Sequence, residues 1–184
     1  MADILEATRS SMRAFCVVAH PDDCAIYGYQ FIMDHRDWDW EICYLTYHPQ
    51  HARVVEMQEF WAKRGIPIKA SGFPDIDNIA TDEVERYLRA ICRNKDIILT
   101  HNSVGEYGHP HHKLIHDIML SVNVPKVYFG TWPDHANHLI ELGQAPFDLD
   151  EIPIHKKALD GCDLTSWKYL ITPEAQNLVN YTHE

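Results

Sequence analysis

The chain has 184 residues, of which 46% are hydrophobic, and its 16 basic and 27 acidic residues give a formal net charge of -11. This length supports one well-buried core, so we expect a single domain over residues 1–184. The negative charge would repel a phosphate backbone and an anionic membrane surface, which argues against nucleic-acid binding.

The sequence also lacks the features of a membrane or exported protein. None of its apolar runs approaches the roughly 20 residues that a membrane span needs, and the first residues, MADILE, lack the basic-then-apolar profile of a secretion signal. The five cysteines form no CxxC pair and indicate neither a disulfide framework nor a zinc knuckle. We therefore expect a cytoplasmic protein.

Strand-like and helix-like segments alternate through the first two-thirds of the sequence. Short apolar runs predict strands at 14–19, 40–46, 66–69, 97–100 and 126–129. Apolar residues at helical spacing predict helices at 24–35, 54–65, 81–91 and 113–121. From about residue 132 the pattern weakens into a poorly defined C-terminal tail, in which it suggests a helix at 159–170.

The alternation predicts an α/β fold in which helices cover both faces of a mostly parallel sheet. Such sheets bind ligands beyond the carboxyl ends of their strands, at the point where the strand order reverses. In a doubly wound sheet the first and fourth strands are neighbours across that point. The loops that follow them, 20–23 and 102–112, should therefore meet at one edge of the sheet.

These two loops carry the side chains of a metal site. The first presents His20, Asp22 and Asp23, and the second presents His109 and His112. A catalytic zinc ion takes three ligands from His and Asp or Glu and keeps a fourth position for water. His20, Asp23 and one histidine of the second loop would provide them, while the other histidine, three residues away on the same helix face, would face a substrate. Asp22 is then left to accept a proton from the water.

Each of these residues also has an ordinary structural explanation. A His-Pro pair at the end of a strand is common in turns, and an Asp-Asp pair is common at a helix N-terminus. Both explanations would have to hold independently in the two loops that the topology brings together. The joint pattern therefore favours the metal site.

The same loops resemble a known enzyme family. The chain carries the segments AHPDD (19–23), THN (100–102) and GEYGHPHH (105–112), which are similar to the motifs of the LmbE/PIG-L family of metal-dependent N-acetylglucosaminyl N-deacetylases. Weaker similarities are the helix RVVE (53–56) and the loop GFPD (72–75). The resemblance implies a Rossmann-like three-layer sandwich with its active site at the carboxyl ends of strands one and four.

The resemblance further implies a zinc-dependent hydrolase that removes acetyl from an N-acetylglucosamine-type sugar or glycoconjugate. It assigns the metal to His20, Asp23 and His112, with Fe²⁺ or another divalent metal as the alternative to Zn²⁺. It assigns Asp22 as the general base and then the acid, and His109 as the group that stabilises the oxyanion. The metal would lower the pKa of its water toward about 7 and polarise the acetamide carbonyl.

Three more residues are assigned by similarity. Tyr107 would also approach the oxyanion, and Arg53 and Asp75 would hydrogen-bond sugar hydroxyls. Arg53 could instead pair with Glu56 at helical spacing, and Asp75 could be a turn residue after Pro74. The sequence leaves both alternatives open.

Three features depart from the family pattern. Cys24 stands where the family usually has glutamate, and His111 stands where it often has aspartate, which could keep His109 charged. His109 would then be neutral near pH 7 unless Glu106 or Asp117 substitutes. The loop between the second strand and the next helix is also short, which predicts a low pocket wall and a bulky or extended acetamido sugar.

Two other functions are compatible with the fold. Two histidines and one carboxylate also form the metal site of iron(II) oxygenases, but those ligands usually have His-x-Asp spacing on β-sandwich strands, and the spacing here is His-x-x-Asp. A non-catalytic sugar or nucleotide binder is the second alternative. The phosphate-binding Gly-x-Gly-x-x-Gly pattern is absent after the first strand, and Asp22 beside intact ligands argues against an inert binder. The sequence leaves the oligomeric state open.

Overall fold

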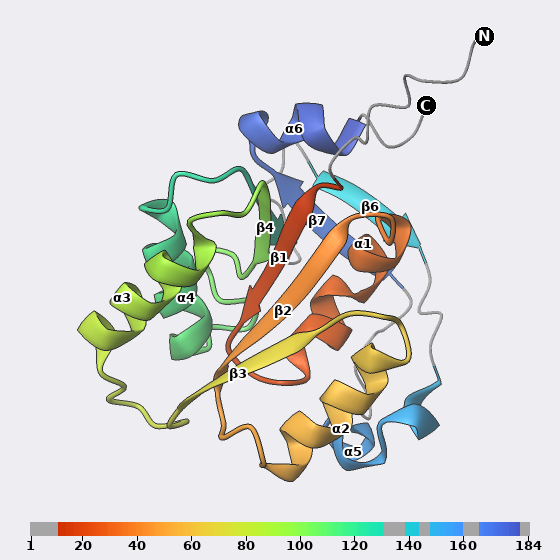
Figure 1. The fold of residues 1–184 in the computed structure, drawn as a ribbon, viewed down its shortest axis with the longest axis vertical. Helices are drawn as coiled ribbons and strands as arrows, with labels where there is room; N and C mark the ends of the chain where they lie inside the picture. The colour runs from red at the N-terminus through yellow and green to blue at the C-terminus, as the bar shows by residue number, and fades with distance from the viewer. Residues whose placement is uncertain (1–10, 131–138, 144–147, 160–165, 181–184) are drawn as a thin grey trace, which may run out of the picture.

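The computed structural model describes residues 11–130, 139–143, 148–159 and 166–180. In these residues the centre is a seven-stranded sheet with the order β3-β2-β1-β4-β5-β7-β6 (Figure 1). The strands are β1 (Arg13–Val18), β2 (Asp39–Thr46), β3 (Ile68–Phe73), β4 (Ile97–Thr100), β5 (Lys126–Phe129), β6 (Leu139–Gly143) and β7 (Ser166–Ile171). The first five run parallel, β7 pairs antiparallel with β5, and β6 pairs antiparallel with β7 at the edge of the sheet. No helix in the described segments has the length and apolar character that a membrane crossing requires.

The side chains of β1 explain why both faces of the sheet are covered. Ala14, Cys16 and Val18 pack into one hydrophobic cluster, whereas Phe15 and Val17 pack into another, and all five are fully buried. The first cluster includes residues of α1 (Tyr29–Asp34), α2 (Ala52–Ala62), α5 (Pro153–Leu159) and α6 (Pro173–Asn180), and the second includes residues of α3 (Thr81–Cys92) and α4 (Pro110–Leu120). The predicted three-layer α/β fold is confirmed.

The predicted elements of the first 130 residues are present, and several of them have shifted ends; the helix predicted at 54–65, for example, is α2. The strand predicted at 66–69 begins and ends later, as β3. The helix predicted to begin at residue 113 begins at Pro110, because His109 caps α4 and proline suits its first position. His112 therefore lies in the first turn of a regular helix. A π-helical turn, η1 (Cys24–Gly28), precedes α1 in the helix predicted at 24–35.

The prediction of a helix at 159–170 is wrong where the structure describes it. α5 ends at Leu159 and is preceded by the short 3-10 helix η2 (Leu149–Glu151), and the later part of the segment belongs to β7. Tyr169 in β7 is fully buried, and its hydroxyl accepts a hydrogen bond from the backbone N–H of Phe31 over 3.2 Å. The run SWKYLI is rich in residues that favour strands, and pairing with β5 selects that conformation. Residues 160–165 lie outside the described part.

The strand order reverses between β1 and β4, as predicted. Ala14 to Val17 pair in parallel with Ile97 to Thr100, while β2 lies on the other side of β1. A hydrogen bond connects the two loops that leave the carboxyl ends of β1 and β4. The backbone N–H of Ala19 donates to Nε2 of His101 over 3.0 Å. The two predicted loops therefore meet at the switch point of the sheet.

The packing of α3 against the sheet gives a stability prediction. Leu88 is fully buried in the second cluster, so its replacement by alanine leaves a cavity and is expected to lower the free energy of unfolding by about 2–5 kcal/mol. Leu120, at the end of α4, is 64% exposed, and its alanine variant is expected to change that energy by less than about 0.5 kcal/mol. Denaturant unfolding measures both, and equal losses would contradict the described packing.

Candidate active site

The loop after β1 holds His20 and Asp23 through its own backbone. The N–H of His20 donates to Oδ2 of Asp23 over 2.8 Å, and the N–H of Asp23 donates to the carbonyl oxygen of His20 over 3.3 Å. Short Asp side chains readily form such local hydrogen bonds. Both residues are buried. The turn therefore brings one imidazole and one carboxylate into the same space.

The loop after β4 is shaped by Asn102 and Gly105. Oδ1 of Asn102 accepts the N–H of Glu106 over 3.2 Å. Gly105 has a φ of 67°, and an added Cβ would lie 2.9 Å from the carbonyl oxygen of His109, so glycine is required here. This turn delivers His109 to the N-terminus of α4 and His112 to its first turn.

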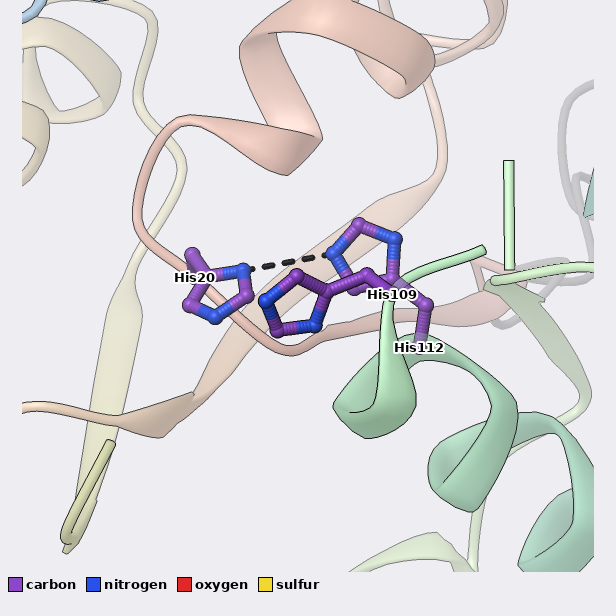
Figure 2. A group of neighbouring side chains, drawn as sticks. All are labelled: His20, His109 and His112. Carbon is purple, nitrogen blue, oxygen red and sulfur yellow. Dashed lines mark hydrogen bonds between the residues drawn. The ribbon is translucent and has the colours of Figure 1, made fainter. Parts of the chain in front are cut away.

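Three ligand atoms from the two loops converge. Nδ1 of His20, Oδ2 of Asp23 and Nε2 of His112 each lie 3.2 Å from the other two. Ligands about 2.0–2.1 Å from a tetrahedral zinc ion lie about 3.3–3.4 Å apart, so this spacing fits a metal ion with little adjustment. Figure 2 shows the rings of His20 and His112 joined by a dashed line, with His109 beside them. The structure thus brings together the three residues predicted as ligands.

Glu106 supports this cluster. Its Oε2 contacts Nδ1 of His112 and lies 2.8 Å from Nδ1 of His101, whose ring stacks on that of His112 with centroids 3.8 Å apart. A carboxylate in this place keeps the proton on Nδ1 of His112, which leaves Nε2 able to bind a metal. Glu106 also has a φ of 56°, which is uncommon for a residue other than glycine and is often found at functional sites.

The imidazoles set the charge of Asp23. Burial by itself would raise the pKa of this carboxyl, but the three surrounding imidazoles, His101, His112 and His20, outweigh burial and hold its pKa well below the ordinary value. Asp23 is therefore a carboxylate at neutral pH, which is the form that binds a metal.

Asp22, which directly precedes Asp23 in the chain, is held by Arg53. Its Oδ1 accepts a hydrogen bond from Nη2 of Arg53 over 2.7 Å. Nη1 of Arg53 donates to the hydroxyl of Tyr47 over 2.9 Å, and Nε donates to Nε2 of His155 over 3.2 Å. Arg53, predicted to contact a sugar or to pair with Glu56, thus pairs with the predicted general base.

Glu56 binds the N-terminus of α5 instead. Its carboxylate accepts the N–H groups of Ile154 over 2.6 Å and of His155 over 3.1 Å, and it also contacts Nδ1 of His155. Because Nδ1 of the fully buried His155 carries the proton toward Glu56, Nε2 is free to accept from Arg53. The C-terminal segment is therefore connected to Asp22 through Arg53.

His109 is neutral in this arrangement. Burial, followed by the nearby imidazoles of His20, His112 and His111, lowers the pKa of His109 to about 4. Its Nδ1 accepts the backbone N–H of His111 over 3.3 Å, so the ring proton is on Nε2. Glu106 is bound to other imidazoles and does not take the place of the absent aspartate.

Tyr107 lies at the surface of the site. It is 69% exposed, and the centroid of its ring lies 5.8 Å from that of His109 and 5.4 Å from that of His112. Burial of its polar end and the surrounding carboxylates raise the pKa of Tyr107 to about 12, so the hydroxyl keeps its proton and can donate it to a hydrogen bond.

Asp75 faces His20 from the loop after β3. Its Oδ1 lies 3.4 Å from Nε2 of His20 and 3.2 Å from Nδ1 of His111, and its Oδ2 accepts a hydrogen bond from Tyr47 over 2.9 Å. Tyr47 itself has a φ of 70°, a strained value for an aromatic residue. These contacts make Asp75 part of the site rather than an ordinary turn residue.

Sequence reasoning did not assign three of these residues to the site. Glu106 and His111 lie inside the GEYGHPHH segment, and their place between proposed ligands was the available signal. His155 gave none, because it lies in the segment without a clear pattern. Cys24, at the position where the family usually has glutamate, packs with its sulfur 3.3 Å from that of buried Cys16.

Comparisons with known sequences do not assign this chain to a family. No protein-family model matches the chain. The "Uncharacterized protein L374" of Acanthamoeba polyphaga mimivirus is 27% identical over 131 residues, which are 61% of this chain and 58% of that protein. The matched part thus spans little more than half the length of that relative.

Comparisons with solved structures show the fold. The A40926 pseudoaglycone deacetylase Dbv21 has a TM-score of 0.60 at 13% identity, over 87% of this chain and 96% of that one. The zinc-inhibited form of the teicoplanin deacetylase Orf2 has a TM-score of 0.61 at 13% identity, over 88% and 99%. The hydratase GalB of Pseudomonas putida KT2440, which acts on 4-carboxy-2-hydroxymuconate, has a TM-score of 0.53 at 13% identity, over 93% and 83%. The chain thus has the fold of these deacetylases, which a hydratase shares, so the site must decide the reaction.

Proposed function

We propose that the protein is a zinc-dependent deacetylase of the LmbE/PIG-L type, which hydrolyses the acetamide of an N-acetylglucosamine-type sugar or glycoconjugate. The observation that carries this proposal is the convergence of three metal-ligand atoms, while Asp22, the residue before Asp23, stays outside this set and pairs with Arg53. A carboxylate in that position can move protons during hydrolysis. The deacetylases that share the fold support the same reaction.

The ligands proposed for the metal are His20, Asp23 and His112. Two imidazoles, one carboxylate and an open position are a donor set of catalytic zinc, and Fe²⁺ is the alternative. A divalent ion bound there supplies a Lewis acid and a water molecule of lowered pKa. Glu106 prepares the site by fixing the proton of His112 on Nδ1.

The residues around the ligands carry the reaction. Asp22, held by Arg53, takes the proton from the attacking water and then gives it to the departing amine, so that acetate and the free amine leave. Nε2–H of His109 and the hydroxyl of Tyr107 donate hydrogen bonds to the oxyanion of the tetrahedral intermediate.

The proposed sugar contacts are Asp75 and Arg53, whose side chains are 32% and 25% exposed. The connection from β2 to α2 spans only residues 47–51, and from this length we propose a low pocket wall beside them. We therefore propose an acetamido sugar that extends beyond this wall as part of a larger conjugate. A solved deacetylase with this fold, at a TM-score of 0.55 and 11% identity, is in complex with teicoplanin, which supports testing conjugates.

Amine release from N-acetylated sugars tests this function. Zinc-loaded protein is expected to release amine from N-acetylglucosamine conjugates faster than from free N-acetylglucosamine, and protein stripped with a chelator should regain this activity when zinc is returned. Turnover of the free sugar alone would contradict the open pocket. Release from none of the acetamides would contradict the hydrolase and favour a sugar binder.

Removing the support for His112 gives a prediction about metal affinity. Glu106→Gln removes the negative charge behind the ligand and is expected to weaken zinc binding by about 10–100-fold. Competition with a chromophoric chelator measures the change. Glu85→Gln, which alters an exposed Glu85–Arg89 pair on α3, is the matched control and should bind as the wild type does. Equal affinity in the two variants would remove Glu106 from the site.

A further inference from the structure

His111 presents a bare ring nitrogen in the interior. Its Nε2 lies 2.9 Å from the carbonyl oxygen of Ile76, and because a carbonyl only accepts, Nε2 carries a proton, so that in the neutral ring Nδ1 keeps a lone pair. His111 is only 4% exposed, and this Nδ1 has no hydrogen-bond partner within the described segments. A buried polar atom without a partner is uncommon in proteins, and a bound ion is one explanation for it.

A carboxylate oxygen close to this nitrogen favours a bound cation over a cavity water. Oδ1 of Asp75 lies 3.2 Å from Nδ1 of His111, while Oδ2 of the same carboxylate is already bound to Tyr47. A carboxylate oxygen and the lone pair of a neutral imidazole repel each other at this distance unless a proton on Nδ1 or a bound cation lies between them. Nε2 of His20 is the third member, 3.4 Å from the same Oδ1, and the three atoms lie within 4.8 Å of one another.

We propose that His111, Asp75 and His20 form a second site, for a divalent transition-metal cation such as zinc. Ligands at bond lengths of about 2.0–2.1 Å lie about 3.3–3.4 Å apart at the corners of a tetrahedron, which is close to both distances to Oδ1. Imidazole and carboxylate are also the donors that such cations prefer.

His20 serves both sites through opposite ring nitrogens. Nδ1 faces Asp23 and His112, and Nε2 faces Asp75. When both nitrogens bind a cation the ring has lost its proton, which passes to solvent, and no electron is transferred. The shared ligand and the repulsion between two cations make the second site the weaker one. It is also the more accessible, since the Asp75 side chain is 32% exposed and that of Asp23 is 4% exposed.

This site would regulate the proposed reaction, a consequence that rests on the proposed function. Asp75 is a proposed contact for the sugar, so a cation held there competes with the substrate for the same carboxylate. Zinc beyond the first equivalent is therefore expected to raise KM for the acetamide.

Zinc titration of metal-free protein by calorimetry tests the second site. The wild type is expected to bind two equivalents, the second more weakly. His111→Asn keeps a donor for the Ile76 carbonyl but offers no imidazole, and it is expected to keep the tight equivalent and to weaken the second by more than about tenfold. If His111→Asn folds poorly, Asp75→Asn, which changes a more exposed side chain, is expected to show the same loss of affinity for the second equivalent. His48→Ala removes an exposed histidine and should keep both equivalents.

Each outcome decides a separate point. A single equivalent in the wild type, or a second one that survives in both His111→Asn and Asp75→Asn, overturns the second site. Loss of the second equivalent in His109→Ala alone would assign it to the neighbouring group of His20, His109 and His112 and would also overturn the proposal. Because the readout is binding, two equivalents without amine release contradict only the proposed function, and amine release with one equivalent contradicts only the second site.

Discussion

Asp22→Asn is expected to lower kcat for amine release by about 10²–10⁴-fold while leaving the affinity for the first zinc equivalent within a few-fold of the wild type. Asp22 is not one of the three converging ligand atoms, so its loss removes the proton carrier and spares the metal site. Asparagine has nearly the same shape and still offers an oxygen to Nη2 of Arg53. Steady-state kinetics together with metal competition measure the two quantities on the same protein.

The matched control for this variant is Asp82→Asn, an exposed carboxylate in the first turn of α3. It should keep wild-type kcat. Thermal unfolding of Asp22→Asn checks that the loss of charge beside Arg53 has not unfolded the protein. Equal kcat in Asp22→Asn and the wild type would remove Asp22 as the base.

The same substitution at the adjacent residue, Asp23, is expected to weaken zinc binding. Asp23→Asn keeps an oxygen for the N–H of His20 but removes the charge that faces the imidazoles, so the first zinc equivalent should bind more weakly than in Glu106→Gln. The expected loss of zinc affinity is therefore larger than the loss of about 10–100-fold that is typical when a hydrogen-bond partner of a metal ligand is removed. Chelator competition measures it, and activity should fall because the metal is lost.

The comparison of the two neighbours is the stronger test. The same chemical change at Asp22 and Asp23 should abolish turnover with the metal retained in one case and lost in the other. Retention of tight zinc binding by Asp23→Asn would contradict the ligand set, even with activity reduced.

The central part of the fold could be predicted because its sequence pattern has one physical explanation. In β1 the residues alternate between two buried faces, and in α3 the apolar stripe that includes Val84 and Leu88 lies against the sheet. The C-terminal strands could not be predicted in this way. β7 forms where an antiparallel partner, β5, offers a free edge, and this long-range pairing leaves no periodic signal in a single sequence.

The site divides in the same manner. The meeting of His20, Asp23 and His112 could be predicted because each stands just after a recognisable strand or at the start of a helix, and the topology brings those positions together. The choice of His112 rather than His109 as a ligand rests on the family resemblance alone. The pairing of Arg53 with Asp22, and of Glu56 with His155, could not be predicted. Helical spacing suggested that Arg53 and Glu56 bind each other, whereas each turns to a partner from a different part of the chain.

The contact between Glu56 and α5 bears on how short a working version of this protein can be. Every residue proposed for the metal and the reaction lies between positions 20 and 112, so a fragment that stops after β5 would keep the complete set. That fragment would leave the Glu56 carboxylate without the N–H groups of α5 and Nε of Arg53 without its acceptor. The minimal unit able to hold Asp22 in this way is therefore expected to extend at least through α5.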